Sequence, residues 1–358
     1  YFDLKLGIVS CIDFARACRD YYPRCVSRIL WLLAELAVIA TDLAEVVGSA
    51  IGLQLLFGIP LTWGICITAA DVLLLLLCTR HYFRHMELVI TALIAVIMGC
   101  FGIILYLVDP SLQGILYGLV PSVEIVRNPH MLYLAIGILG ATVMPHNLYL
   151  HSSVVIKEDL VTTAQKSESI WYSSLDLCIA LTFAFFVNAA ILIVAAALFF
   201  KRGMHDVAEI QDAYALFTPL LNTSIASFVF ALALLISGQN STLTGTLAGQ
   251  IILEGFMDFR MAAWLRRFLG RIITIIPALI GIAIWGESCL SHMMILSQVI
   301  LSLQLPFAVF PLVQFTSSRG IMGKFTNSAL VRRCAYTFGG IIVAVNVLLL
   351  YFLVDGSF

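Results

Sequence analysis

The stretch from Met131 to Val155 decides the fold of this chain, and its centre reads Gly140-Ala141-Thr142-Val143-Met144-Pro145-His146-Asn147. The stretch is long and apolar enough to cross a bilayer. Pro145 has no backbone N–H, so we expect the carbonyl of Ala141 to lose its partner within the helix. Unpaired carbonyls at membrane depth are tolerated only where protein or a watery cavity receives them.

The side chains around Pro145 suggest what such a cavity would hold. Met144 offers a thioether, which is a soft metal ligand, and His146 and His151 are two groups that can carry protons. One interpretation is the wall of a metal ion site. The other is a kinked helix with two hydrogen-bonded histidines, and these residues alone leave both open because proline kinks are common in membrane helices.

Composition places the chain among all-α polytopic membrane proteins. It has 358 residues, of which 61% are hydrophobic and 11% charged. The net charge of −1 argues against a nucleic-acid partner. The sequence contains no HExxH, GxSxG, GxxxxGK[ST] or CxxCH motif, so neither an enzyme nor a permanently bound cofactor is indicated. Cys11, Cys18 and Cys25 recur every seven residues, and we interpret them as packing residues on one face of a helix.

Nine apolar stretches are predicted to span the membrane within one transmembrane domain of residues 1–358. Residues 1–25 before them suit a cytoplasmic surface segment, and the start at Tyr1 without a signal peptide suggests an incomplete N-terminus. Of the 20 Lys and Arg residues, all but Arg127, Lys201 and Arg202 fall on one side, which predicts a cytoplasmic N-terminal segment and an external C-terminus. The predicted spans are 27–56, 60–79, 86–108, 131–155, 172–200, 224–254, 269–287, 291–316 and 334–354.

The first span contains three carboxyl groups. Glu35, Asp42 and Glu45 lie seven and three residues apart, which places them on one helical stripe. Acids inside a membrane usually face the bundle interior and mark ion or proton paths, although hydrogen bonding between helices is the alternative. Glu35 lies nearer the inner end, where snorkelling or pairing with Arg28 is simpler. For Asp71 in the second span, a structural role and a proton role are equally supported.

Later spans carry further polar groups. Residues 237–246 are unusually polar, and close helix packing is the favoured interpretation over ion coordination. Gln298 precedes Pro306 and Pro311, so its amide oxygen is a candidate for a central cavity, with a packing contact as the alternative. Arg271 opens the seventh span with Arg266 and Arg267. Most arginines there are lipid-facing or topological, but one of them could pair with a buried carboxyl and complete a proton exit.

Several motifs together resemble the Nramp family, proton-coupled carriers of manganese and iron. The run from Met144 to His151, Met-Pro-His-Asn-Leu-Tyr-Leu-His, is similar to the signature of the family's sixth helix. The resemblance continues through Ala34-Glu35-Leu36-Ala37 with Thr41-Asp42-Leu43-Ala44-Glu45, through Asn240-Ser241-Thr242 with Gly249-Gln250 and Glu254-Gly255-Phe256, and through Gln304-Leu305-Pro306-Phe307-Ala308. It covers nearly the whole chain, and the bacterial manganese importers are the most similar in character.

The resemblance implies a leucine-transporter-like fold of eleven helices, nine of them present here, with a broken sixth helix at the metal site. Met144 would supply the thioether, Ala141 a backbone carbonyl and Gln298 an amide oxygen to Mn²⁺, Fe²⁺ or a similar ion, because soft sulfur favours these metals over calcium and magnesium. His146, His151, Asp42 and Glu45 match family positions implicated in proton movement. Arg271 joins them as a pairing partner.

One departure from the family pattern keeps an alternative open. The family's first helix carries an Asp-Pro-Gly-Asn motif that completes the metal site, and this sequence has none. The main interpretation is proton-coupled import of divalent transition metals by alternating access. The alternatives are a non-transporting Nramp-like scaffold or receptor, an inactive fragment that lacks half of the metal site, and a proton channel built on Asp42, Glu45 and His146. The sequence does not indicate the oligomeric state.

Overall fold

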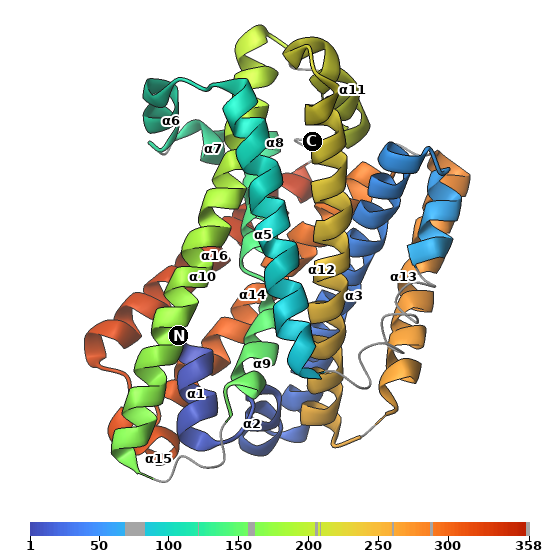
Figure 1. The fold of residues 1–358 in the computed structure, drawn as a ribbon. Coiled ribbons are helices and arrows are strands. Elements are labelled where there is room, and N and C mark those ends of the chain that lie inside the picture. Colours follow the sequence, from blue (N-terminus) through green and yellow to red (C-terminus); the bar gives the residue numbers. More distant parts are fainter. Residues whose placement is uncertain are drawn as a thin grey trace.

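The protein is a bundle of α-helices (Figure 1). The computed structural model describes residues 1–68, 83–120, 122–156, 162–204, 207, 209–259, 261–286 and 289–355. The predicted all-helical fold is confirmed for these residues. Its α-helices are α1 Phe2–Ser10, α2 Phe14–Tyr21, α3 Arg24–Phe57, α5 Phe83–Val108, α6 Leu112–Gly118, α7 Glu124–Arg127, α8 Pro129–Thr142, α9 Pro145–Val154, α10 Thr163–Leu198, α11 Ile210–Leu221, α12 Ser224–Met257, α13 Ala263–Trp285, α14 Cys289–Thr316, α15 Arg319–Met322 and α16 Ala329–Asp355.

Seven segments of the described chain are long and apolar enough to cross a membrane, and they coincide with seven of the predicted spans. The predicted span 27–56 is the continuous helix α3, which is not among the seven. The predicted span 60–79 and Asp71 fall largely outside the described residues. The seven segments are Leu88–Val108, Pro129–Val154, Thr163–Arg202, Ser224–Met257, Leu265–Ile284, Cys289–Thr316 and Ala329–Phe352.

The centre of the bundle is built from α3, α12 and α14, with α3 packed against both of the others. Small residues permit this close approach. A Cβ added at Gly238 of α12 would collide with Ser49 Oγ of α3, and one added at Gly52 would lie 3.0 Å from the backbone of Leu235. Close packing therefore explains the small residues of the polar stretch 237–246, as expected.

The N-terminal part of the chain differs from the expectation. Residues 3–8 of α1 are buried, so a surface position is wrong for this helix, which contacts α9, α10 and α14. The expectation of one helical face for the three cysteines is also wrong. Cys11 follows α1 in a left-handed conformation, Cys18 lies buried in α2, and Cys25 lies exposed in α3 beyond Pro23. Two chain breaks thus remove the helical register that a spacing of seven assumes.

Candidate functional site

The helix that crosses the membrane at Pro129–Val154 is broken at its centre, as the sequence predicts. α8 ends at Thr142 and α9 begins at Pro145. Val143 and Met144 between them have non-helical backbone angles, with φ −109° and ψ 79° for Val143 and φ −77° and ψ 117° for Met144. Pro145 occupies the first position of α9, where a missing N–H does no harm to the new helix. The same missing N–H leaves the carbonyl of Ala141 without its helical donor.

The break lies against α14. A Cβ added at Gly140 would collide with the carbonyl oxygen of Gln298 and lie 2.9 Å from the backbone N of Ser302. Gly140 therefore lets the backbones of α8 and α14 meet one residue before Ala141. Gln298 donates from Nε2 to Ser297 Oγ at 2.9 Å, whereas its Oε1 is buried without a hydrogen-bond partner among the described residues. This amide oxygen therefore has a lone pair with which it can coordinate a metal ion.

His146, directly after Pro145, is fixed by α3. Its Nδ1 lies 3.2 Å from Thr41 Oγ1, and that hydroxyl donates its hydrogen to the carbonyl of Ala37 at 3.0 Å. The hydroxyl oxygen therefore lies within hydrogen-bond distance of both a backbone carbonyl and the imidazole ring. Both side chains are buried, so this contact couples the second half of the broken helix to the helix that carries Asp42 and Glu45.

His151 lies one turn further along α9 and pairs with α1. Its Nδ1 is 2.7 Å from Asp3 Oδ2. Burial raises the pKa of Asp3, whereas the hydrogen bond with His151 and the charge of His151 lower it, so that the pKa lies below its ordinary value. Ser152 adds a second link, because its hydroxyl accepts a hydrogen bond from the backbone N–H of Phe14 at 3.0 Å.

The carboxyl groups of α3 face α12 and α13, as their spacing predicts. Ideal Cβ positions at Gly245 and Gly270 lie 3.7 Å and 3.4 Å from the carboxylate oxygens of Asp42, so two glycines make room for this side chain. Glu45 is buried beside it, and neither of its carboxylate oxygens has a hydrogen-bond partner in the described part of the chain. Arg271 approaches Glu45 Oε2 to 3.7 Å.

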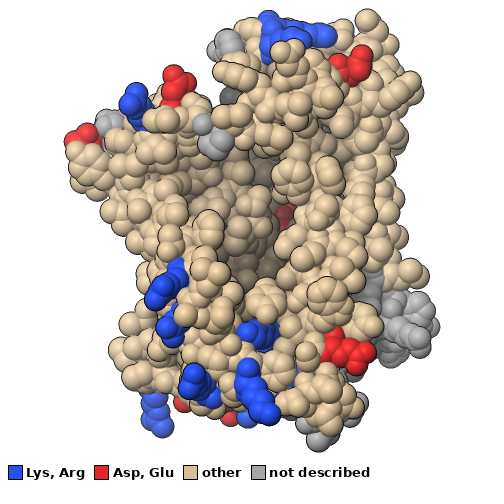
Figure 2. All heavy atoms as spheres, turned by 90° about the vertical axis from the view of Figure 1, so that its left-hand side faces the viewer, with Lys and Arg blue, Asp and Glu red and all other residues tan. Residues whose placement is uncertain are grey.

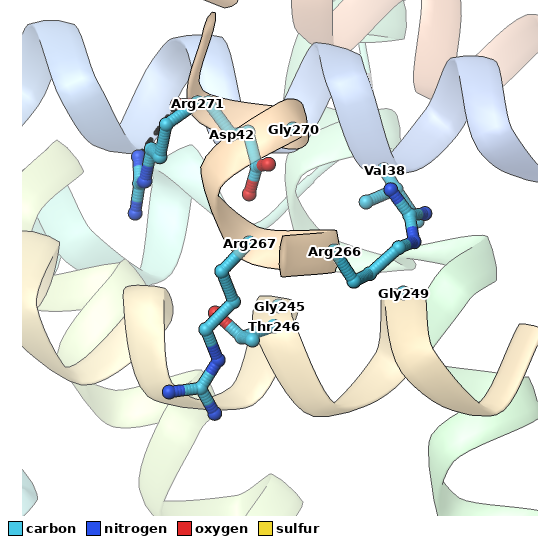
Figure 3. A pocket seen from close by; sticks show the side chains of 9 residues that line it. All are labelled: Val38, Asp42, Gly245, Thr246, Gly249, Arg266, Arg267, Gly270 and Arg271. Atoms are coloured by element: carbon cyan, nitrogen blue, oxygen red, sulfur yellow. Dashed lines mark hydrogen bonds between the residues drawn. The ribbon is translucent and has the colours of Figure 1, made fainter. Parts of the chain in front are cut away.

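Arg271 also joins α3 to α12. It donates to Thr242 Oγ1 at 3.0 Å and to the backbone carbonyl of Asp42 at 3.5 Å. The expectation that most of these arginines are lipid-facing is wrong, because Arg267 and Arg271 are buried. Figure 3 shows them with Arg266 around a small cavity of about 20 Å³. The cavity is lined by Val38, Asp42, Gly245, Thr246, Gly249, Arg266, Arg267, Gly270 and Arg271.

Glu35 has a different partner from the one expected. It accepts hydrogen bonds from Nη2 of Arg266 on α13 and from Nε1 of Trp31, the latter at 3.2 Å. Pairing with Arg28 is therefore wrong. Arg28 lies only two turns away on the same helix, but the bundle brings Arg266 to the face on which all three carboxyl groups lie.

The space-filling view shows the surroundings of these groups. In Figure 2 a hollow opens in the middle of the face, and an acidic side chain is visible at its depth. Most Lys and Arg residues in this view gather at the lower end, where Figure 1 places α1, α2 and α15. Among the described residues, no three His, Cys, Asp or Glu side chains gather into a metal-binding cluster. The candidate donor atoms are accordingly the thioether of Met144, the carbonyl of Ala141 and the amide of Gln298.

The family is decided by comparison with known proteins. The model of the Nramp family, described as natural resistance-associated macrophage protein-like, matches residues 1–352. The chain belongs to the Nramp family. It is 54% identical over 348 residues to a divalent metal cation transporter MntH of Nostoc sp., covering 97% of this chain and 79% of that protein. It is 51% identical over 349 residues to the MntH protein of Listeria innocua, covering 97% of this chain and 78% of that protein.

Solved structures of relatives agree with this Nramp assignment. A manganese transporter of Eremococcus coleocola, crystallised with an aromatic bis-isothiourea substituted compound, matches with a TM-score of 0.87 and 37% identity. The match covers 98% of this chain and 76% of that chain. A mutant of the same transporter matches with a TM-score of 0.85 and 36% identity over the same shares. The chain is therefore a multi-pass membrane protein, and the predicted resemblance is confirmed.

The sequence did not predict the roles of three residues that form hydrogen bonds at or beside the predicted site. Thr41 stands directly before Asp42 and Asp3 lies far from His151 in sequence, so no local spacing joins either residue to its histidine. Asn346 is a lone amide in the apolar last span, where it bonds Ser302 of α14. A polar side chain in such a span was a usable signal, because it must find a partner within the bundle.

Proposed function

We propose that this Nramp protein imports divalent transition metal ions, manganese and also iron, across the cytoplasmic membrane together with protons, by alternating access. The observation that carries the proposal is the broken helix. Pro145 leaves the carbonyl of Ala141 without its helical donor. Met144 lies within the break, and the backbone of Gln298, whose side-chain Oε1 is buried without a partner in the described chain, packs against Gly140. The names of the relatives, divalent metal cation transporter and manganese transporter, support the same substrate class.

The set of ligand atoms explains why the substrate would be a divalent transition metal ion. The thioether favours manganese, iron and similar ions over calcium and magnesium, whereas carbonyl and amide oxygens bind all of these ions. Met144, Ala141 and Gln298 would hold the ion only in transit. Because all three ligands are neutral, they would bind the ion weakly enough for it to be released again.

Protons would move through groups adjacent to this site. His146 is joined to α3 through Thr41, and Asp42 and Glu45 follow on the same helix. Arg271 would compensate the charge of Glu45 at 3.7 Å whenever that carboxyl is ionised. His151 would exchange protons at the far end of α9, where it is about one third exposed and paired with Asp3.

The finer architecture belongs to the same proposal. The chain would supply nine of the eleven helices of a leucine-transporter-like fold, in which a broken helix carries the ion at the midplane. Residues 1–25 would lie on the cytoplasmic side and the C-terminus outside. The concentration of Lys and Arg at the end that holds α1, α2 and α15 supports this orientation (Figure 2).

Manganese uptake into proteoliposomes with an acidic outer buffer tests the proposal. We expect concentrative uptake by the wild type and, for Met144→Ala, a loss of roughly tenfold in uptake together with weaker discrimination against calcium. Met131→Ala on the exposed side of α8 is the matched control and should transport normally. Absence of flux in the wild type would favour the scaffold or receptor, and unchanged selectivity in Met144→Ala would contradict the metal site.

A further inference from the structure

A second proline lies in the helix that faces the break. α14 continues through Pro306, so the carbonyl of Ser302, four residues earlier, has no helical N–H to accept. The side chain of Asn346 on α16 fills this position. Its Nδ2 donates to the carbonyl of Ser302 at 2.9 Å, and its Oδ1 accepts from Ser302 Oγ at 3.1 Å.

Both ends of the Asn346 amide form hydrogen bonds with the same residue, Ser302. Ser302 is 0% exposed and Asn346 is 4% exposed, in a helix that is otherwise strongly apolar. An amide side chain in such a place is costly unless both of its ends are bonded. Here both ends bond Ser302, so Asn346 forms a two-point connection between α16 and α14 that an apolar residue cannot form.

The connection lies one helical turn from the candidate metal site. Gly140 of α8 packs against both the carbonyl of Gln298 and the backbone N of Ser302. The stretch of α14 from Gln298 to Ser302 is therefore held from two sides, by α8 at Gly140 and by α16 at Asn346. If the second contact is lost, the turn that carries Gln298 is free to shift away from the break.

We propose that Asn346 is a positioning residue for metal transport. It replaces the backbone donor that Pro306 removes, and it thereby fixes the turn of α14 that presents Gln298 to the broken helix. The inference rests on the proposed function, because it assumes that Gln298 contributes to the metal site. Asn346 itself does not touch the ion.

Substitution of Asn346 by leucine tests the contact with little change in volume. We expect Asn346→Leu to raise the KM for manganese about tenfold, since an unpaired buried carbonyl shifts an equilibrium by roughly that factor. The Vmax per folded transporter should change less than KM. Ser302→Ala is the matched control, because it removes the hydroxyl contact and keeps the bond to the carbonyl, so its KM should stay within about threefold of wild type.

Rescue distinguishes positioning from general destabilisation. Pro306→Ala restores an N–H that can reach the carbonyl of Ser302 within the helix, so the double variant Asn346→Leu/Pro306→Ala should recover most of the lost affinity. Amide hydrogen exchange in α14 should rise in Asn346→Leu and fall again in the double variant. If Asn346→Leu does not fold, a folded and transporting double variant supports the proposal.

The outcomes distinguish failure of the proposed transport function from failure of the positioning role of Asn346. A wild type without manganese flux contradicts the proposed function, whereas the hydrogen-exchange result then still decides whether Asn346 fixes α14. A transporting wild type with an unchanged KM in Asn346→Leu overturns the positioning role. The positioning role is also overturned if the KM of the double variant is raised by the product of the increases in the two single variants.

Discussion

Pro145 and Pro306 lie in two helices that touch, and they have opposite consequences. Each removes the helical donor of a carbonyl four residues earlier, Ala141 in one case and Ser302 in the other. At Pro306 the helix α14 runs on, and Asn346 supplies the missing donor. At Pro145 the helix stops at Thr142 and restarts as α9.

The difference shows that a proline in a membrane helix does not by itself make a binding site. What decides is whether a neighbouring side chain satisfies the carbonyl. The carbonyl of Ser302 accepts a hydrogen bond from Asn346, and this bond connects α14 to α16. After Thr142 two residues leave the helical conformation, and Met144, the second of them, carries a thioether. The first site is suited to hold a helix in place, and the second to hold an ion.

The largest effect is expected from Pro145→Ala. This change provides an N–H for the carbonyl of Ala141 and favours continuation of α8 into α9, which would draw Met144 into a helix. We expect manganese uptake in proteoliposomes to fall by roughly 100-fold, the upper end of what loss of a metal site's support costs.

Pro306→Ala is the matched control for this experiment. Its carbonyl is already satisfied by Asn346, so uptake should stay within about threefold of wild type. Equal losses of uptake in Pro145→Ala and Pro306→Ala would show that both prolines serve only to shape their helices. This result would contradict the different roles assigned to them.

An intermediate effect is expected where the two regions meet. Gly140→Ala places a methyl group against the carbonyl of Gln298. Because this carbonyl belongs to the backbone of α14, no flexible side chain can move aside to relieve the clash. We expect a loss of about 2 kcal/mol in stability, typical of overpacking, together with weaker manganese uptake. Both follow from the forced separation of α8 and α14.

Gly137→Ala, one turn earlier on α8, is the control for crowding. A Cβ there would meet Ile295 Cγ2 at 3.7 Å, an ordinary contact, so thermal stability and uptake should remain near wild type. A thermal unfolding series in detergent, followed by uptake at equal amounts of folded protein, measures both. If the two alanine variants behave alike, the approach of α8 to α14 at Gly140 is not what holds the site.

The sequence predicted those features that depend on local chemistry. Pro145 inside an apolar span indicated a break or a kink, and the spacing of Glu35, Asp42 and Glu45 placed them on one face, because both follow from helix geometry. The partner of each polar group could not be predicted in this way. Glu35 has possible cations on its own helix and on α13, and only the packing of the bundle selects Arg266 over Arg28.

The N-terminal segment shows the same limit. Lys5, Arg16, Arg19 and Arg24 suggested a surface, yet α1 is buried because Lys5 donates to Asn327 Oδ1 at 2.8 Å and Asp3 pairs with His151. Such long-range pairs satisfy charges that composition alone assigns to water. The Ser302 contact of Asn346 is a further case, since the register between α14 and α16 cannot be read from either helix.

The smallest effect concerns how the broken helix is anchored. α9 has only 10 residues, and two polar contacts tie its far end to α1 and α2, from His151 to Asp3 and from Ser152 to the backbone N–H of Phe14. The hydrogen bond with His151 lowers the pKa of Asp3 in the folded state below its ordinary value of 3.8. The stabilising contribution of Asp3 is therefore complete above pH 4 and disappears as the pH falls towards 2.

Asp3→Asn should remove this contribution. We expect a loss of about 1 kcal/mol at pH 7, discounted for the partial exposure of His151, and a flatter decline of the melting temperature between pH 5 and pH 2 than in the wild type. Asp20→Asn on α2 is the control, because that side chain is 40% exposed and should leave the pH profile unchanged. Parallel pH profiles for wild type and Asp3→Asn would show that α9 is held by its apolar contacts alone, and that the break needs no charged anchor.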